Sequence, residues 1–69
     1  MPFVSIRIVD GVLGEGAAEK KAEISRQVSE VLSSSAGVPQ DRVWVVFEDI
    51  PAAEWYVGAK SVATIKAEG

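Results

Sequence analysis

The sequence predicts an α+β fold, in which two parallel strands and one connecting helix form a single βαβ unit followed by a short C-terminal hairpin. Three observations support this class. Residues 2–9 repeat with a period of two, residues 17–36 carry a helical apolar stripe, and residues 43–47 are almost wholly apolar. A chain of 69 residues has room for one domain, which we place at residues 1–69.

The first strand is predicted at residues 2–9, where β-branched side chains recur at alternate positions. One face would carry Pro2, Val4, Ile6 and Ile8, and the other Phe3, Ser5, Arg7 and Val9. Proline is tolerated at the first position of a strand, where no ladder hydrogen bond needs its missing N–H. Asp10-Gly11 ends the strand, and a flexible connection runs on to Gly16.

The helix is predicted over residues 17–36, because apolar side chains recur there at helical spacing. The stripe consists of Ala17, Ile24, Val28, Val31 and Leu32. Gly37 is suited to the position just after a helix, which often needs a left-handed backbone. We therefore expect Val28, Val31 and Leu32 to pack on the sheet.

The second strand is predicted at residues 43–47, whose apolar run suits a strand covered on both faces. Two strands joined through a long helix form a right-handed crossover, so they should be parallel. A loop follows Asp49-Ile50-Pro51, Gly58 marks a turn, and residues 61–66 are predicted as a short return strand. Residues 67–69 should fray at the end of the chain.

The composition excludes several kinds of site and partner. The chain has no cysteine and no histidine, which excludes disulfides, Cys/His zinc sites, cysteine nucleophiles and histidine bases. The net charge is −3 with no basic cluster, so we expect no nucleic-acid partner. No apolar run approaches the ~20 residues that span a bilayer. Because the N-terminus also lacks the layout of a signal peptide, we expect a cytoplasmic protein without a membrane partner.

The predicted fold leaves one face of its sheet uncovered. One helix covers one face, and two strands alone are not independently stable. The sequence is 48% hydrophobic with a mean hydropathy of +0.18, more apolar surface than so small a domain hides easily. Without disulfides or a metal, small domains gain stability by association. The sequence therefore predicts a symmetric oligomer.

Several features taken together resemble one known family. They are the segment Met1-Pro2-Phe3-Val4-Ser5-Ile6-Arg7-Ile8, the glycine after it, the single helix, the apolar second strand, and Glu48-Asp49-Ile50-Pro51 followed by Trp55 and Val57-Gly58. In this order they resemble the 4-oxalocrotonate tautomerase family over nearly the whole chain. The resemblance implies a tautomerase-like fold and hexamers, assembled as trimers of dimers from βαβ protomers. It also implies that an amino-terminal proline, exposed by removal of methionine, acts as catalytic base or acid.

Pro2 is the catalytic residue that this resemblance implies. A free α-amine has an ordinary pKa of roughly 8, and burial in an apolar pocket lowers that pKa further. In a chain without histidine and cysteine, such an amine is one of few groups that can exchange a proton near neutral pH. The alternative is that Met1 is retained and Pro2 only begins an edge strand. Its nitrogen is then an amide and no base.

The sequence departs from the family at two substrate-binding positions. Members that process dianionic oxo acids carry an arginine directly after the strand-ending glycine and another at the head of the second strand. The first of these positions holds Val12, or a residue of the Gly14-Glu15-Gly16 insertion, and the second holds Trp44. Without these cations a dicarboxylate loses its bidentate partners. The resemblance therefore implies a small enol or keto monoacid as substrate, with no cofactor.

Four side chains are candidates for substrate binding: Trp55, Trp44, Arg42 and Lys60. Trp55 matches the family's aromatic wall near the proline, while Arg42, like Arg7, is a cation that could replace the missing arginines. Structural roles stay open for all of them, since aromatic residues favour interfaces and lone cations favour solvent. No metal site is predicted.

Two other functions fit the same sequence. The chain could be a structural subunit that keeps the fold without catalysis. It could also belong to a hetero-oligomer, supplying Pro2 while a partner chain supplies the arginines. The processing of Met1 and the number of chain types in the native protein distinguish these functions.

Overall fold

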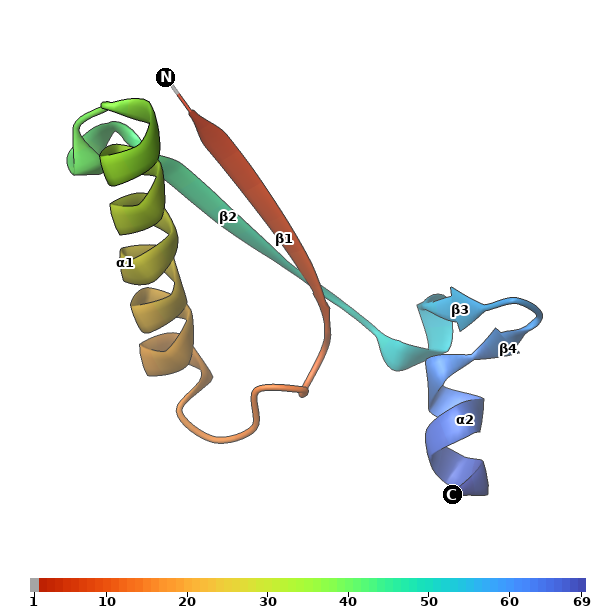
Figure 1. The fold of residues 1–69 in the computed structure, drawn as a ribbon. Coiled ribbons are helices and arrows are strands. Elements are labelled where there is room, and N and C mark those ends of the chain that lie inside the picture. The colour runs from red at the N-terminus through yellow and green to blue at the C-terminus, as the bar shows by residue number, and fades with distance from the viewer. Residues whose placement is uncertain (1) are drawn as a thin grey trace.

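The computed structural model describes residues 2–69, which form a βαβ unit followed by a small C-terminal module (Figure 1). The elements in chain order are β1 (Phe3–Val9), α1 (Ala17–Ala36), η1 (Gln40–Arg42), β2 (Trp44–Ile50), η2 (Ala52–Glu54), β3 (Tyr56–Val57), β4 (Lys60–Ser61) and α2 (Val62–Glu68). The predicted α+β class is confirmed, and α1 has the predicted bounds. Met1, whose removal or retention decides whether Pro2 has a free amine, lies outside the described residues.

β1 and β2 form a two-stranded parallel sheet, as the crossover predicted. The register pairs Phe3 with Trp44 at one end and Val9 with Ile50 at the other. β2 begins one residue later than the predicted strand 43–47, because Val43 ends η1. It extends three residues further at its other end, because each of those residues finds a partner on β1. This register fixes which side chains share a face.

α1 packs along one face of the sheet. That face carries Val4, Ile6 and Ile8 of β1 and Val45 and Phe47 of β2, all half-buried. Lys21 of α1 reaches the same face, where its Nζ lies 2.7 Å from an oxygen of Asp49 and 5.7 Å from the centre of the Phe47 ring. These contacts hold the first half of the helix against the carboxyl ends of the strands.

The outward face of α1 is charged and exposed. Arg26 forms ion pairs with Glu23 at 2.7 Å and with Glu30 at 2.8 Å. Its hydrogen bonds to Glu23, helped by one from Gln27, lower the pKa of that carboxyl to about 2. The ladder of charges identifies this side of α1 as the solvent face.

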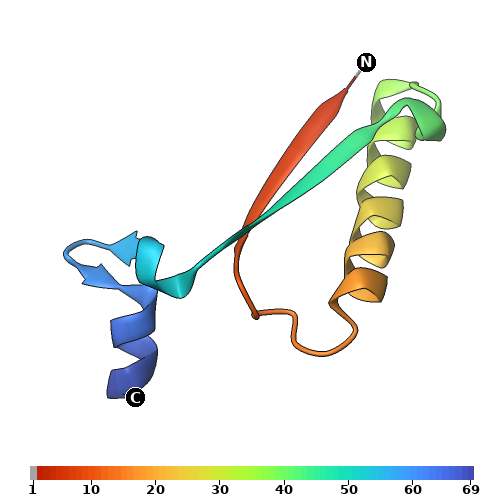
Figure 2. The ribbon, with the colours of Figure 1, turned by 180° about the vertical axis from the view of Figure 1, so that it is seen from behind.

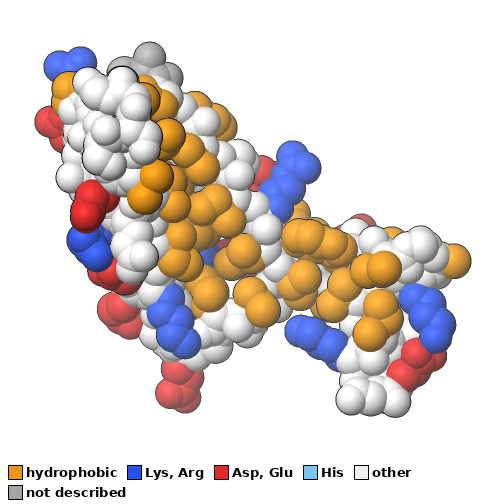
Figure 3. All heavy atoms as spheres, in the orientation of Figure 1, with side chains coloured by type: hydrophobic (Ala, Val, Ile, Leu, Met, Phe, Trp, Pro, Cys, Tyr) orange, Lys and Arg blue, Asp and Glu red, His pale blue; other side chains and the backbone are white. Residues whose placement is uncertain are grey.

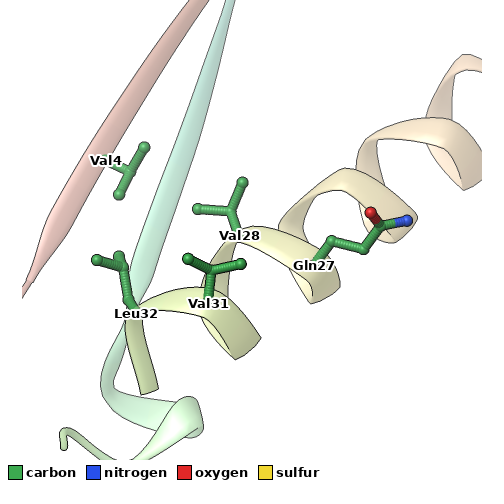
Figure 4. A pocket seen from close by; sticks show the side chains of 5 residues that line it. All are labelled: Val4, Gln27, Val28, Val31 and Leu32. Atoms are coloured by element: carbon green, nitrogen blue, oxygen red, sulfur yellow. The ribbon is translucent and has the colours of Figure 1, made fainter. Parts of the chain in front are cut away.

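One member of the predicted stripe does not pack on the sheet. Val31 is 60% exposed, whereas Val28 and Leu32 are half-buried. Figure 4 shows these three side chains and Val4 around an open groove between α1 and β1, of about 420 Å³. The prediction for Val31 was wrong because two strands, spaced about 4.8 Å apart, are narrower than a helix about 10 Å across.

We expect Leu32→Ala to destabilise the chain more than Val31→Ala. Truncation of the Leu32 side chain would leave a cavity between helix and sheet. This cavity should lower the free energy of unfolding by about 2 kcal/mol or more. Val31 is 60% exposed, so its truncation should cost less than about 1 kcal/mol. Urea denaturation followed by circular dichroism measures both. Equal costs would show that another copy covers Val31 in the assembled protein.

The C-terminal segment makes the predicted turn but not the predicted return strand. Gly58 has φ +65° and lies between β3 and β4, which pair antiparallel. The return strand is limited to Lys60–Ser61, and residues 62–68 form α2 instead of a strand to residue 66. The residues predicted to fray are thus helical as far as Glu68.

Ser61 accounts for this difference. Its hydroxyl oxygen accepts a hydrogen bond from the backbone N–H of Thr64 at 3.1 Å, which caps the first turn of α2. At the other end, Glu68 pairs with Lys60 at 2.7 Å. A cap and an ion pair therefore close a helix over a segment whose side chains alone favoured a strand.

The chain is extended, and its C-terminal module stands away from the βαβ unit (Figures 1 and 2). The radius of gyration is 15.1 Å, against about 11 Å for a compact chain of this length. The accessible surface is 4931 Å², against about 4,200 Å² for a compact monomer of this mass. Among residues 2–69 no hydrophobic side chain is buried. Stability therefore has to come from surfaces that a single chain leaves open.

The second face of the sheet is not covered by α1. This uncovered face consists of Phe3, Ser5 and Arg7 of β1 and Trp44, Val46 and Glu48 of β2. Phe3, Trp44 and Val46 are 62%, 54% and 39% exposed. Exposed hydrophobic side chains also continue from the βαβ unit onto the C-terminal module (Figure 3). Such contiguous apolar surface is typical of an interface.

The helices of residues 2–69 include none that is long and apolar enough to cross a membrane.

Candidate active site

Pro2 lies directly before β1, at the end of the sheet where β2 begins. Its carbonyl oxygen accepts a hydrogen bond from the backbone N–H of Trp44 at 3.0 Å. The residue is half-buried. Because the ring fixes φ and the carbonyl is bonded across the sheet, the Pro2 nitrogen is held in a defined position.

Trp44 and Arg42 lie at the same end of the sheet as Pro2. Trp44 is the Cα partner of Phe3, so its indole belongs to the uncovered face. This placement favours packing, the structural role left open by the sequence. Arg42 closes η1 and is exposed, and its side chain forms no ion pair within the described part of the chain.

Trp55 and Lys60 lie beyond the opposite end of β2. Trp55 is half-buried and lines a shallow groove of about 430 Å³. The other residues around this groove are Arg7, Glu48, Ile50, Glu54 and Tyr56. Lys60 in β4 is engaged by Glu68 at 2.7 Å, so its charge is already paired.

The structure thus divides the predicted site residues into two groups. Pro2, Arg42 and Trp44 lie where the strands begin, and Trp55 and Lys60 lie past the point where they end. Strands of seven residues span roughly 20 Å. One chain therefore does not bring the proline and the aromatic wall together, and a pocket that contains both needs a second chain.

A polar cluster that the sequence did not single out lies on the uncovered face. Arg7 donates from Nε to Oε1 of Glu48 at 3.1 Å, and the Ser5 hydroxyl donates to the same oxygen at 3.3 Å. The alternation of β1 places Ser5 and Arg7 on one face, but only the register with β2 adds Glu48. Within residues 2–69 no group of three acidic side chains is placed to hold a metal ion.

Comparison with known proteins places the chain in a family. The family described as tautomerase enzyme matches residues 2–65, beginning at Pro2. The chain belongs to this family. A probable tautomerase of Campylobacter jejuni is 35% identical over 99% of this chain and 96% of its own length. Another from Lactococcus lactis is 32% identical over 87% of this chain and 92% of its own length. The resemblance inferred from the sequence is confirmed.

Solved structures of tautomerase homologues share the fold. TomN, a 4-oxalocrotonate tautomerase homologue of the tomaymycin biosynthetic pathway, has a TM-score of 0.83 at 24% identity, covering 96% of this chain and 95% of its own. DmpI from Helicobacter pylori has a TM-score of 0.84 at 19% identity, covering 99% and 100%. A heterohexamer 4-oxalocrotonate tautomerase from Chloroflexus aurantiacus is 27% identical, with a TM-score of 0.76 and coverage of 91% and 95%.

Proposed function

We propose that this chain is a subunit of an oligomeric tautomerase that interconverts the enol and keto forms of a small oxo acid. Pro2, freed by removal of Met1, is the base that becomes the acid. The observation that carries the proposal is the position of Pro2, held across the sheet by Trp44 at the residue where the family match begins.

The proposed reaction moves one proton from oxygen to carbon and shifts the double bond from carbon–carbon to carbon–oxygen. The free amine of Pro2 takes the proton of the enol hydroxyl and leaves an enolate. As the enolate oxygen forms the carbonyl, the electrons of the carbon–carbon double bond take the proton from the ammonium, so the amine is regenerated. A neutral amine near physiological pH is needed for the first transfer, which is why a half-buried position that disfavours the cation is suitable.

The substrate is a monoacid in this proposal. Val12 and Trp44 replace the two arginines that the family uses for a dianion, and both side chains are largely exposed and apolar. Arg42 is the cation best placed to hold a single carboxylate. It is exposed at the end of η1, two residues before Trp44, whose backbone N–H donates to the Pro2 carbonyl oxygen. Lys60 is the weaker candidate because Glu68 already engages it.

The pocket is proposed to form between chains. Trp55 can wall a pocket around Pro2 only if it comes from another copy, since the two lie beyond opposite ends of the sheet. The open groove beside Val4 and Leu32, on the helix-covered side of β1, offers apolar surface for such a contact. A homohexamer, a trimer of dimers, is the assembly we expect.

A hetero-oligomer is the second candidate. It is favoured by the missing arginines and by the likeness to a heterohexamer tautomerase from Chloroflexus aurantiacus. In that assembly this chain would supply Pro2 and a second chain the cations. The cytoplasmic location and the lack of a cofactor stay predictions.

Native mass spectrometry of the purified protein tests the proposed assembly. We expect a hexamer of a single chain type, with each subunit lighter by one methionine residue. The physical reason is that no hydrophobic side chain of residues 2–69 is buried in the single chain. A monomer would therefore leave this apolar surface in water. A folded monomer at micromolar concentration would contradict the assembly, and retained Met1 would contradict Pro2 as the base. Assembly only after a second chain is added would favour the hetero-oligomer.

A further inference from the structure

We propose that the Tyr56 hydroxyl of one copy donates a hydrogen bond to the enolate oxygen of a substrate that is bound at Pro2 of another copy. The inference rests on the proposed function, because it needs the interchain pocket in which Trp55 walls Pro2. It adds a second catalytic residue to that pocket. Tyr56 keeps its own proton throughout, so the proton transfer between Pro2 and the substrate is unchanged.

Tyr56 lies in the same groove as Trp55. The two residues follow each other in the chain, and both line the groove of about 430 Å³ where β2 meets the C-terminal module. Tyr56 is 59% exposed, and within residues 2–69 its hydroxyl forms no hydrogen bond. An assembly that brings Trp55 to Pro2 of another copy therefore brings an unpartnered donor with it.

The backbone that carries both aromatic side chains is braced by hydrogen bonds. The Trp55 N–H donates to the carbonyl oxygen of Ala52 at 3.4 Å, and the Trp55 carbonyl oxygen accepts from the N–H of Val62 at 2.7 Å. Tyr56 in turn pairs with Ser61 in the antiparallel ladder of β3 and β4. A donor stabilises a developing charge best when it is in place before the charge appears. The braced hairpin gives the Tyr56 side chain such a fixed support.

The enolate oxygen has few other donors available. When Pro2 removes the enol proton, negative charge develops on that oxygen, and a positioned hydrogen-bond donor stabilises it. The chain has no histidine, and the two arginines that the family uses for a dianion are missing. Arg42, the cation closest in sequence to Trp44, is assigned to the substrate carboxylate in the proposed function. The enolate oxygen therefore needs a donor from elsewhere.

The side chains around the groove favour Tyr56 as that donor. Arg7 is already engaged by Glu48, and Glu54 is only an acceptor when it is ionised. The Trp55 side chain is half-buried, which suits a wall of the pocket. The phenolic hydroxyl of Tyr56 is an uncharged donor on an exposed side chain, so a substrate held by a neighbouring copy can reach it.

Tyr56→Phe tests the hydroxyl alone, because the substitution removes one oxygen atom and keeps the ring. We expect kcat for ketonisation of phenylenolpyruvate to fall by about tenfold or more, with KM changed by less than about twofold. This split is expected of an interaction that strengthens only as charge develops on the oxygen. The pH dependence of kcat/KM should keep its apparent pKa, because the Pro2 amine is intact.

Ser34→Ala is the matched control. It removes an exposed hydroxyl from α1, outside the groove, where the Ser34 hydroxyl donates only to the carbonyl oxygen of Val31. It should leave kcat unchanged. Circular dichroism and native mass spectrometry check that both variants keep their helix content and their assembly.

Mixed oligomers test whether Tyr56 acts on another copy. One parent is Tyr56→Phe, and the other carries an added alanine ahead of Pro2 and so has no free amine. In an oligomer refolded from both chains, an intact Pro2 can meet an intact Tyr56 only across a chain boundary. We expect the mixture to be more active than the mean of its two parents. Native mass spectrometry confirms that both chain types are present.

Three outcomes would overturn the inference alone, in a wild-type protein whose activity needs the free Pro2 amine. They are an unchanged kcat in Tyr56→Phe, an equal loss in the Ser34→Ala control, and mixed oligomers no more active than the mean of their parents. A wild-type protein without activity, or one that stays active when alanine precedes Pro2, would instead overturn the proposed function.

Discussion

Adding one alanine ahead of Pro2 should abolish the ketonisation of phenylenolpyruvate that we expect of the processed protein. The addition converts the Pro2 amine into an amide, whose nitrogen has no basic lone pair. General acid–base catalysis by a positioned group contributes typically about 10²–10⁴ in rate, and a loss of this size is expected. The decay of the enol absorbance at fixed enzyme concentration measures it.

The pH dependence tests the same group independently. In the processed protein kcat/KM should rise with pH as the Pro2 ammonium loses its proton. The apparent pKa should lie at or below about 8, because partial burial disfavours the cation. Pro2→Ala is the milder variant, since an amino-terminal alanine still presents an amine. Native mass spectrometry of the extended protein confirms that loss of activity is not loss of assembly.

Two results would contradict this assignment. If the extended protein ketonises phenylenolpyruvate as fast as the processed form, Pro2 is not the base. If neither form exceeds the rate in buffer alone, the chain is a structural subunit or requires a partner chain.

The elements with strong periodic signals could be predicted from the sequence. The 17–36 helix has the predicted bounds because the end of its apolar stripe is followed directly by Gly37. The φ of Gly37 is +73°, the left-handed conformation that often follows the last residue of a helix. The parallel pairing followed from the long crossover between residues 9 and 44, since only a chain of that length can return to pair in parallel.

The C-terminal segment shows where local pattern fails. Residues 62–66 contain β-branched side chains that favour a strand, and their apolar run is too short for periodicity to decide. A single hydrogen bond from the Thr64 N–H to the Ser61 hydroxyl oxygen tips the segment toward helix. Capping by serine is visible in the sequence, but its weight against strand propensity is not.

The sequence could suggest individual residues of the candidate site, but not how they are arranged in space. Pro2 and Trp55 were singled out by resemblance, but their separation by the full length of the strands depends on which strand end each lies at. The Arg7–Glu48 contact depends on the register of β1 and β2, and a shift of one residue would move Glu48 to the other face. How these groups come together is a property of the assembly, and a single sequence carries only the surfaces that make it.

The processed protein should convert phenylenolpyruvate with a kcat/KM at least about tenfold higher than that for 2-hydroxymuconate. The dicarboxylate has to move two anionic groups out of water into a site where Val12 and Trp44 offer no paired cation. An uncompensated buried charge costs several kcal/mol, and about 1.4 kcal/mol already corresponds to a factor of ten. A higher kcat/KM for 2-hydroxymuconate than for phenylenolpyruvate would contradict the proposed substrate class.

Restoring the cations should reverse this preference. Both positions are open to longer side chains, because Val12 and Trp44 are largely exposed in the single chain. In the double variant Val12→Arg/Trp44→Arg, kcat/KM for 2-hydroxymuconate should rise by about tenfold or more, since each arginine can bind a carboxylate bidentately. Ala22→Arg, on the exposed side of α1 and outside both aligned positions, adds the same kind of charge and should leave the ratio of the two substrates unchanged. An equal gain in the Ala22→Arg control would mean that net charge, rather than the two positions, governs the preference. No gain in a double variant that still assembles would mean that these positions do not face the substrate in this oligomer.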